Sequence, residues 1–285
     1  MKTFKTAFLL TALTLLLLFV GQAVGGRNGM TLALVMAVIM NGTAYFFSDK
    51  IALMSSGAQP ISREQSPRLY AVMERLAAKA NLPMPKLYMI PQPAPNAFAT
   101  GRNPSHASVA VTQGLMQLMD DEELEGVIAH ELSHVRNYDI LTSSIAATIA
   151  GAITWIGYTG RWALMFGGWG GGRDNEREGG GIAALLMLIL APIAATLLQL
   201  GISRQREYQA DASGAQMVGH PYGLMRALEK LGAYNKKIPM DISPSTSALC
   251  IVAPLSTRDF VTGLFSTHPP LADRIARLQN MTITR

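Results

Sequence analysis

Residues 127–135 read Val-Ile-Ala-His-Glu-Leu-Ser-His-Val, and the fold of the middle of the chain follows from this stretch. His130 and His134 are four positions apart, so on a helix both imidazoles stand on one face, where they can share a zinc ion. Glu131 lies beside that face, where its carboxylate can reach a zinc-bound water. The helix has an apolar back formed by Val127, Ile128 and Val135. The stretch therefore predicts a buried helix that binds a metal ion.

The neighbouring residues set the limits of this helix, which we expect over Asp121–Tyr138. Asp120, followed three residues later by Glu123, is typical of a capping box at a helix start. Towards the C-terminus we expect helices over 203–218 and 222–233, and a last helix at the C-terminal end.

The residues before the motif predict a helix and a small sheet. Residues 62–81 place their apolar side chains on one helical face. Five prolines then separate short strands, of which Lys86–Ile90 is the first. Asn96–Thr100 and Ala107–Thr112 form an expected hairpin pair around Gly-Arg-Asn-Pro-Ser-His.

Charged residues are unevenly distributed along the chain. Its 285 residues include 24 Lys or Arg and 19 Asp or Glu, which is 15% charged, against about 25% in a typical soluble domain. Four stretches carry no charge: 6–26, 28–48, 140–160 and 179–203. The composition argues against a purely cytosolic enzyme, a secreted disulfide scaffold and a disordered tail. The single cysteine, Cys250, excludes a disulfide within the chain and a cysteine-based zinc site.

The charge-free stretches predict four membrane-spanning helices, since about 20 apolar residues cross a bilayer. Phe8–Val24 and Thr31–Phe47 form a helical hairpin around Gly-Gly-Arg-Asn-Gly, and Ile182–Leu200 is a further clear span. Ile140–Tyr158 is diluted by hydroxyl residues, which suit a helix–helix interface in lipid. A cleaved signal peptide is the alternative for residues 1–26, but a second apolar span follows them at once.

Positive charges predict the orientation of these spans. Of the Lys and Arg residues, only four fall in the two loops between paired spans: Arg27, Arg161, Arg173 and Arg177. By the positive-inside rule, both soluble segments and both termini are cytoplasmic. The net charge of +5 comes without any run of five Lys or Arg, so we interpret it as membrane topology and expect no nucleic-acid partner.

These observations divide the chain into four parts. Residues 1–48 form the first transmembrane hairpin, and residues 49–139 form the first half of a cytosolic domain with the metal-binding helix. Residues 140–202 form a second hairpin with a Gly-rich periplasmic loop. Residues 203–285 complete the cytosolic domain. The expected fold is a mostly α integral membrane protein with a small β-sheet.

A catalytic zinc ion needs three protein ligands and an open position, and residues 203–215 offer candidates for the third. Glu207 and Asp211 are four positions apart, and the small residues around them allow this helix to approach another closely. Glu207 would be the third ligand, and Asp211 would orient a ligand histidine by accepting its other N–H. Solvated carboxylates on a helix fit the same spacing, so both interpretations stay open on the residues alone.

Four stretches together resemble the HtpX-type membrane zinc metalloproteases, which are relatives of the CAAX prenyl proteases. These stretches are Asn96–Thr112, His130–His134, Ser203–Ala215 and Ser266–Leu278. In that family the Glu of Arg-Glu-Tyr-x-Ala-Asp is the third zinc ligand, which implies this role for Glu207. The resemblance covers nearly the whole chain, with no departure from the family's motifs. It implies a zincin-like α+β metalloprotease domain with one Zn²⁺ per chain.

The resemblance also implies an activity and a location. The family's activity is endoproteolysis of misfolded or damaged membrane proteins at the bacterial inner membrane, a stress-response role in quality control. Expected partners are therefore protein substrates and the lipid bilayer, with the active site cytoplasmic. The oligomeric state is not indicated.

The expected chemistry assigns roles to further residues. Zinc lowers the pKa of its water from 15.7 to about 7, and Glu131 serves as general base and then acid. His268 and Arg274 resemble the family's C-terminal His and Arg, which implies a second donor to the oxyanion. The alternative for His268 is a loop residue before a helix that starts at Pro-Pro. The alternative for Arg274 is a solvated position on that helix.

Substrate is expected to bind by strand addition along a strand of low bulk. The strand residues are Asn96, Ala97, Phe98 and Ala99.

Two other functions fit the His-Glu-x-x-His motif. A membrane scaffold or chaperone could bind zinc without hydrolysis, although it would need no Glu131. A prenyl-peptide protease has the same motif, but its relatives carry more than four spans.

Overall fold

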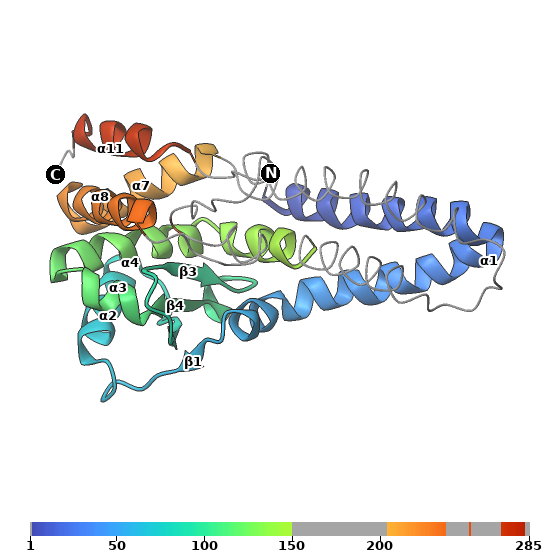
Figure 1. Cartoon of the computed structure of the whole chain (residues 1–285), viewed down its shortest axis with the longest axis horizontal. Coiled ribbons are helices and arrows are strands. Elements are labelled where there is room, and N and C mark those ends of the chain that lie inside the picture. The colour runs from blue at the N-terminus through green and yellow to red at the C-terminus, as the bar shows by residue number, and fades with distance from the viewer. Residues whose placement is uncertain (1, 150–203, 238–250, 252–268, 283–285) are drawn as a thin grey trace.

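The computed structural model describes residues 2–149, 204–237, 251 and 269–282. Its described residues are mostly helical and include a small mixed sheet (Figure 1). The helices are α1 (Lys2–Ser55), α2 (Pro67–Lys79), α3 (Gln113–Leu118), α4 (Asp121–Arg136), α7 (Arg204–Val218), α8 (Tyr222–Lys237) and α11 (Leu271–Gln279), with a 3-10 turn at Pro104–His106. The strands are β1 (Gln59–Pro60), β2 (Lys86–Ile90), β3 (Ala97–Thr100) and β4 (Ser108–Thr112).

The sheet and helices α2, α3, α4, α7, α8 and α11 pack together into one lobe. The long helix α1 doubles back on itself, so that both of its ends lie next to this lobe (Figure 1). The break is at Gly25 and Gly26, and Gly26 has a positive φ of 57°, which glycine adopts without steric cost. The predicted five-residue turn was therefore too long. The returning helix also runs past the predicted end at Phe47 to Ser55, because Ala52 and Leu53 pack beneath the sheet.

Among the described residues, one helix is long and apolar enough to span a membrane. Gly25–Ser55 is long enough and has a mean hydropathy of 1.7, whereas Thr6–Phe19 and Asp139–Ile149 are shorter apolar helices. The predicted span Ile182–Leu200 and the Gly-rich loop lie outside the described residues.

Helix Asp139–Ile149 packs inside the α1 hairpin. It shares one buried cluster with both arms of α1, made of Leu9, Leu13, Ala44, Ile145, Ala146 and Ile149. The Thr6 and Thr142 hydroxyls are 3.2 Å apart and hydrogen-bonded within this contact. Three described apolar helical segments therefore form one bundle beside the lobe.

The four strands form a sheet in the order β1-β2-β4-β3. Strand β3 pairs antiparallel with β4, with Ala97 opposite Val111, which confirms the predicted hairpin pairing. Strand β2 runs parallel to β4. Side chains alternate between the two faces of a strand, so Val109 and Val111 enter the helical core while Ala110 meets the end of α1. Strand β3 lies at the edge of the sheet.

Local signals explain the ends of the helices. Asp120 and Glu123 form the predicted capping box, with side-chain to backbone hydrogen bonds of 2.9 Å in both directions. Helix α2 begins at Pro67, later than the predicted residue 62. The residue before a proline is kept out of the helical region, and Ser66 has φ −145° and ψ 67°.

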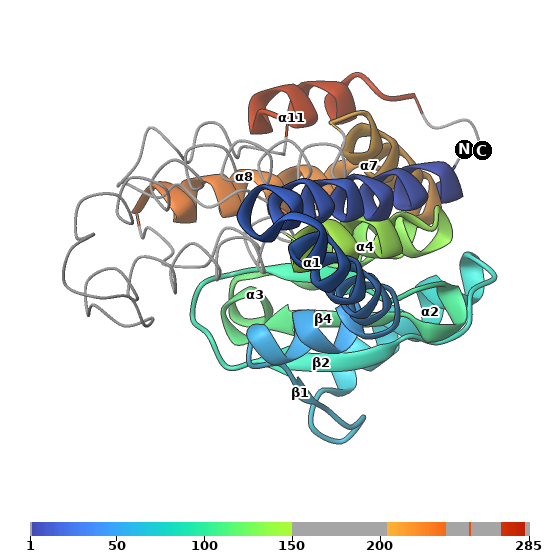
Figure 2. The ribbon, with the colours of Figure 1, turned by 90° about the vertical axis from the view of Figure 1, so that its right-hand side faces the viewer.

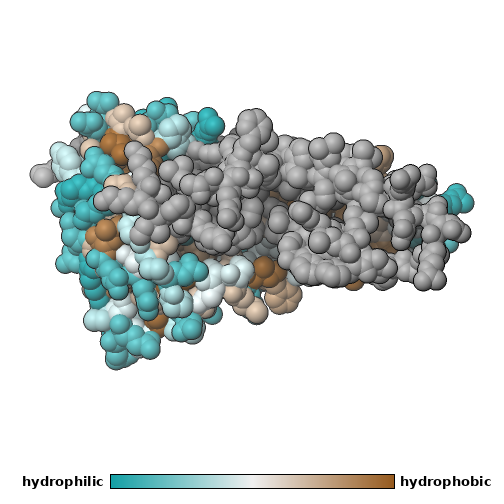
Figure 3. Space-filling view, in the orientation of Figure 1, coloured by the Kyte–Doolittle hydropathy of each residue, from teal (hydrophilic) through white to brown (hydrophobic). Residues whose placement is uncertain are grey.

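Helix α4 lies at the centre of the lobe, between the sheet with α2 on one side and α7 with α8 on the other (Figure 2). The opposite side of α7 and α8 is covered by α11. The face of the lobe seen in Figure 3 is mostly hydrophilic. Gly214 of α7 lies against α4: a Cβ there would be 3.0 Å from the His130 nitrogen. The predicted close approach of these two helices is thus confirmed.

Candidate metal centre

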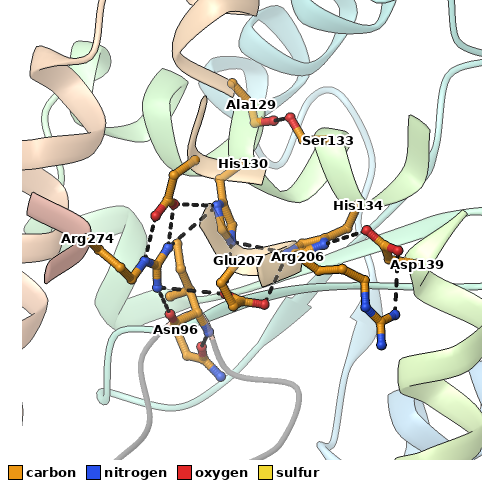
Figure 4. Close-up of polar contacts among 11 residues, drawn as sticks. Asn96, Ala129, His130, Ser133, His134, Asp139, Arg206, Glu207 and Arg274 are labelled. Carbon is orange, nitrogen blue, oxygen red and sulfur yellow. Dashed lines mark hydrogen bonds and ion pairs between the residues drawn. The ribbon is translucent and has the colours of Figure 1, made fainter. Parts of the chain in front are cut away.

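Three side chains from two helices converge at the contact of α4 with α7. The Nε2 atoms of His130 and His134 are 3.3 Å apart. The Glu207 carboxylate reaches both, with Oε2 at 3.7 Å from the His130 Nε2 and Oε1 at 3.6 Å from the His134 Nε2. Donor atoms of all three lie within 4.8 Å of one another (Figure 4).

This spacing fits a single metal ion. Two nitrogens bound at about 2.0–2.1 Å to one tetrahedral ion lie about 3.3–3.4 Å apart, and the two imidazoles are already at that separation. The Glu207 oxygens lie 3.6 and 3.7 Å from these nitrogens, only a few tenths of an ångström more than the separation of the two nitrogens. Two neutral imidazoles and one carboxylate are also a donor set that zinc accepts. The residues present therefore fit a metal ion with a position open for water.

The outer nitrogen of His130 is held by a buried ion pair. His130 Nδ1 is 2.9 Å from Asp211 Oδ1. Arg274 donates two hydrogen bonds to the same carboxylate, at 2.7 and 2.8 Å, and a third of 2.7 Å to the Ile251 carbonyl. The side chain of Arg274 is 1% exposed. Asp211 thus accepts from the ring N–H of His130, which leaves Nε2 free of a proton and directed at the site.

The charges explain how this arrangement is kept. Burial by itself would raise the pKa of Asp211, but Arg274 and His130 outweigh it and lower the pKa. Burial lowers the pKa of His130, which favours the neutral imidazole that a metal requires. For His134, burial also disfavours the proton, but the Asp139 and Glu207 carboxylates outweigh it and raise the pKa to about 9. The carboxylates around His134 therefore favour positive charge at this end of the site.

Glu131 is buried beside the three donors. Burial is the main cause that raises its pKa to about 8, and the Glu207 carboxylate adds to the shift. The Ala99 N–H donates a hydrogen bond to the Glu131 carboxylate, which ties the helix to strand β3. A carboxyl group with this pKa exchanges protons near neutral pH.

The structure brings together most of the residues predicted for the site. His130, Glu131, His134 and Glu207 meet at one point, and Asp211 lies behind His130. The predicted strand from Asn96 to Ala99 borders Glu131. Arg274 lies behind the donors: it donates two hydrogen bonds to Asp211, and its Nη1 is 3.8 Å from Oε2 of the donor Glu207. His268 lies outside the described residues, so its role stays a prediction.

One neighbour of the site was missing from the sequence interpretation. Asp139 Oδ2 is 3.5 Å from His134 Nδ1, and Arg206 Nη1 is 3.5 Å from Asp139 Oδ1. Five positions along a continuous helix would place Asp139 about 140° away from His134. The spacing therefore carried no signal for this contact.

Comparison with known proteins agrees with this geometry. The model of peptidase family M48 matches residues 63–282, which include every described donor of the site. The chain is 57% identical over 274 residues to a protease HtpX homolog of Desulfatibacillum aliphaticivorans, covering 96% of this chain and 88% of that protein. It is 52% identical over 283 residues to the protease HtpX homolog of Thermodesulfovibrio yellowstonii, covering 99% of each.

A solved structure shares the fold. The crystal structure of S. mikatae Ste24p aligns with a TM-score of 0.53 at 20% sequence identity. The alignment covers 97% of this chain but only 64% of Ste24p, so the chain spans less than two thirds of that protein. From the family match, the HtpX relatives and the converging donors, we conclude that this chain belongs to peptidase family M48 and is an HtpX-type metalloprotease that acts on peptide or protein substrates.

Proposed function

We propose that this protein is a zinc-dependent endopeptidase of the bacterial inner membrane that hydrolyses misfolded or damaged membrane proteins. The observation that carries the proposal is the convergence of His130, His134 and Glu207, with Glu131 beside them. The first three would hold zinc. A structural zinc site has four protein ligands and no open position, and it would need no buried carboxyl group beside it.

The chain's own residues divide the chemistry among them. Zinc, when bound, polarises the scissile carbonyl and lowers the pKa of a water to about 7. Glu131 takes the proton from the attacking water and delivers it to the leaving amine. Its carboxyl group is buried beside the donor atoms, so the same group can take up the proton from the water and then deliver it to the amine. Asp211 holds the tautomer of His130, and the contacts of Arg274 support a role in fixing Asp211. His268 stays the predicted second donor to the oxyanion.

Substrate binding along β3 is the next part of the proposal. The Ala99 N–H donates to Glu131, and the Ala97 N–H donates to the Asn96 side chain, so neither points at β4. Backbone groups of alternate strand residues point the same way, and the Ala97 and Ala99 carbonyls therefore face the outer edge beside the metal site. An extended peptide could pair with this edge, and main-chain hydrogen bonds would give affinity without strict sequence preference.

Peptides with one backbone N-methyl group test this placement without altering the enzyme. A series with the methyl group moved along the chain should raise KM at the positions that donate to β3, and leave KM unchanged at alternate positions. A uniform KM across the series would argue against strand addition.

The membrane topology is proposed from charge and from the hairpin. Both ends of α1 lie at the lobe (Figure 1), which supports the proposal that α1 crosses the membrane twice and that the N-terminus and the lobe are on the same side. The chain enters the hairpin with helix Asp139–Ile149 and is back in the lobe at α7. Cytoplasmic placement of the lobe is supported by the positive-inside rule. A reporter fused after Arg285 should be cytoplasmic, and one inserted at Gly171 periplasmic. A periplasmic signal from the first would overturn the topology.

Proteolysis by the purified full-length protein in detergent is the decisive experiment. Cleavage of a casein-like substrate should stop with a chelator and return with added zinc, and the Glu131→Gln variant should bind zinc without cleavage. Zinc binding with no cleavage by the wild type would favour the scaffold interpretation. In cells, Glu131→Gln should accumulate uncleaved misfolded membrane proteins as captured complexes, while capture of only soluble proteins would contradict the substrate class.

A further inference from the structure

His134 has a carboxylate neighbour of its own, on the side of the ring that faces away from His130. Asp139 Oδ2 lies 3.5 Å from His134 Nδ1, while His134 Nε2 points at the donor cluster. The Asp139 side chain is 11% exposed and that of His134 is 16% exposed, so the pair is only partly screened by water. The two ring nitrogens of His134 therefore have different surroundings: Nε2 faces the metal site, and Nδ1 faces Asp139.

A break in the backbone creates this contact. Helix α4 ends at Arg136, and Tyr138 then takes a positive φ of 59°. A side chain other than glycine, asparagine or aspartate rarely adopts this left-handed conformation, which persists where the surroundings impose it. The reversal brings Asp139 back beside the helix turn it has just left. Helix Asp139–Ile149 then starts in a new direction.

The other oxygen of Asp139 faces a cation from α7. Arg206 Nη1 lies 3.5 Å from Asp139 Oδ1, and Arg206 directly precedes the donor Glu207 (Figure 4). The order histidine, carboxylate, arginine is the same as in the set His130, Asp211 and Arg274. The second set is looser: 3.5 Å separates its histidine and carboxylate, against 2.9 Å in the first.

From this repeated arrangement we propose that Asp139, held by Arg206, is a positioning residue for His134. Its carboxylate accepts the Nδ1–H of His134, which leaves Nε2 unprotonated and aimed at the metal. This inference rests on the proposed zinc site. The carboxylate partner of a ligand histidine typically contributes 10–100-fold to metal affinity or activity. Because the distance is longer and the pair more exposed, we place the contribution of Asp139 at about 10-fold, below that of Asp211.

Zinc affinity of the full-length protein, measured by competition with a chromophoric chelator, tests the inference. Asp139→Ala should raise the zinc Kd about 10-fold, and Asp139→Glu should restore part of it, since the longer side chain can still reach Nδ1. The absorption spectrum of the Co²⁺-loaded Asp139→Ala variant should also change, because the orientation of His134 is less defined. The Tm of the metal-free Asp139→Ala variant, compared with that of the metal-free wild type, shows whether Asp139 stabilises the fold independently of zinc.

Asp121→Ala is the matched control. Asp121 is also a carboxylate at an end of α4 paired with an arginine, Arg68, but within the described part of the chain no histidine is paired with it. Its zinc Kd should equal that of the wild type. If Asp139→Ala leaves the zinc Kd and the Co²⁺ spectrum unchanged, Asp139 only stabilises the backbone turn and the inference is wrong. If Asp139→Ala does not fold, the same measurements are made on Asp139→Asn. A wild-type zinc Kd in Asp139→Asn would show that the negative charge of Asp139 does not contribute to zinc binding, and would overturn the inference.

Failure of this inference is distinguishable from failure of the zinc site. Wild-type protein that binds no zinc would refute the proposed function. Wild-type protein that binds one zinc ion, with unchanged affinity in the Asp139 variants, would refute only the role of Asp139.

Discussion

Gly214→Ala tests whether the closeness of α7 to α4 sets the geometry of the metal site. A Cβ at position 214 would lie 3.0 Å from the His130 nitrogen and 3.1 Å from the Ala129 carbonyl carbon. Ordinary contacts between such atoms begin near 3.5 Å, so the two helices must separate by about 0.5 Å. Both neighbours are backbone atoms of a buried helix and cannot turn aside.

The expected effect differs between stability and metal binding. Overpacking costs about 1–3 kcal/mol, and replacing a helical glycine by alanine returns about 1 kcal/mol, so the metal-free protein loses little stability. Metal sites tolerate about 0.2 Å in ligand distances, and Glu207 and Asp211 both move with α7. We therefore expect the zinc Kd to rise at least about 10-fold, equivalent to about 1.4 kcal/mol, with kcat/KM falling alongside.

The assay compares zinc Kd, kcat/KM and the Tm of the metal-free protein with those of Gly232→Ala. Gly232 lies in α8, where the described neighbour of an added Cβ is the end of the flexible Leu271 side chain. This control should keep wild-type zinc affinity. Wild-type zinc affinity in Gly214→Ala would refute the reasoning, because it would mean that the site does not depend on the helix separation.

The remaining predictions concern the donors and the helix start. Glu131→Gln should keep its zinc, measured by atomic absorption, and lose about 10²–10⁴-fold in turnover; near-wild-type turnover would assign the base elsewhere. Glu207→Ala should lose zinc and proteolysis together, whereas Asp211→Ala should cost about 10–100-fold in either. Full zinc and activity in Glu207→Ala would mean that another residue, with His268 the next to test, is the third ligand. Asp120→Ala should remove the α4 capping box and destabilise the protein by about 1 kcal/mol, seen as a lower Tm with unchanged zinc Kd; an unchanged Tm would show that tertiary contacts alone hold this helix end.

Features that depend on a few neighbouring residues were predictable. The capping box at Asp120 and the strand Lys86–Ile90 follow from local hydrogen bonding and from proline spacing, and the structure has both. Helix α2 begins later than its apolar periodicity predicts, because Pro67 keeps Ser66 out of the helical region. The returning arm of α1 is longer than predicted, because its last turns pack against the sheet through Ala52 and Leu53.

The common helical face of His130 and His134 is predictable from the residues alone, since a spacing of four residues is a local property of a helix. For Glu207 and Asp211 the sequence allows two interpretations, metal-site residues or solvated carboxylates on a helix. Their place at the metal site depends on the packing of α7 against α4 at Gly214. The fold likewise brings Arg274 to Asp211 and turns Asp139 back to His134. These contacts join segments far apart in the chain or across a helix break, and no periodicity extends across such gaps.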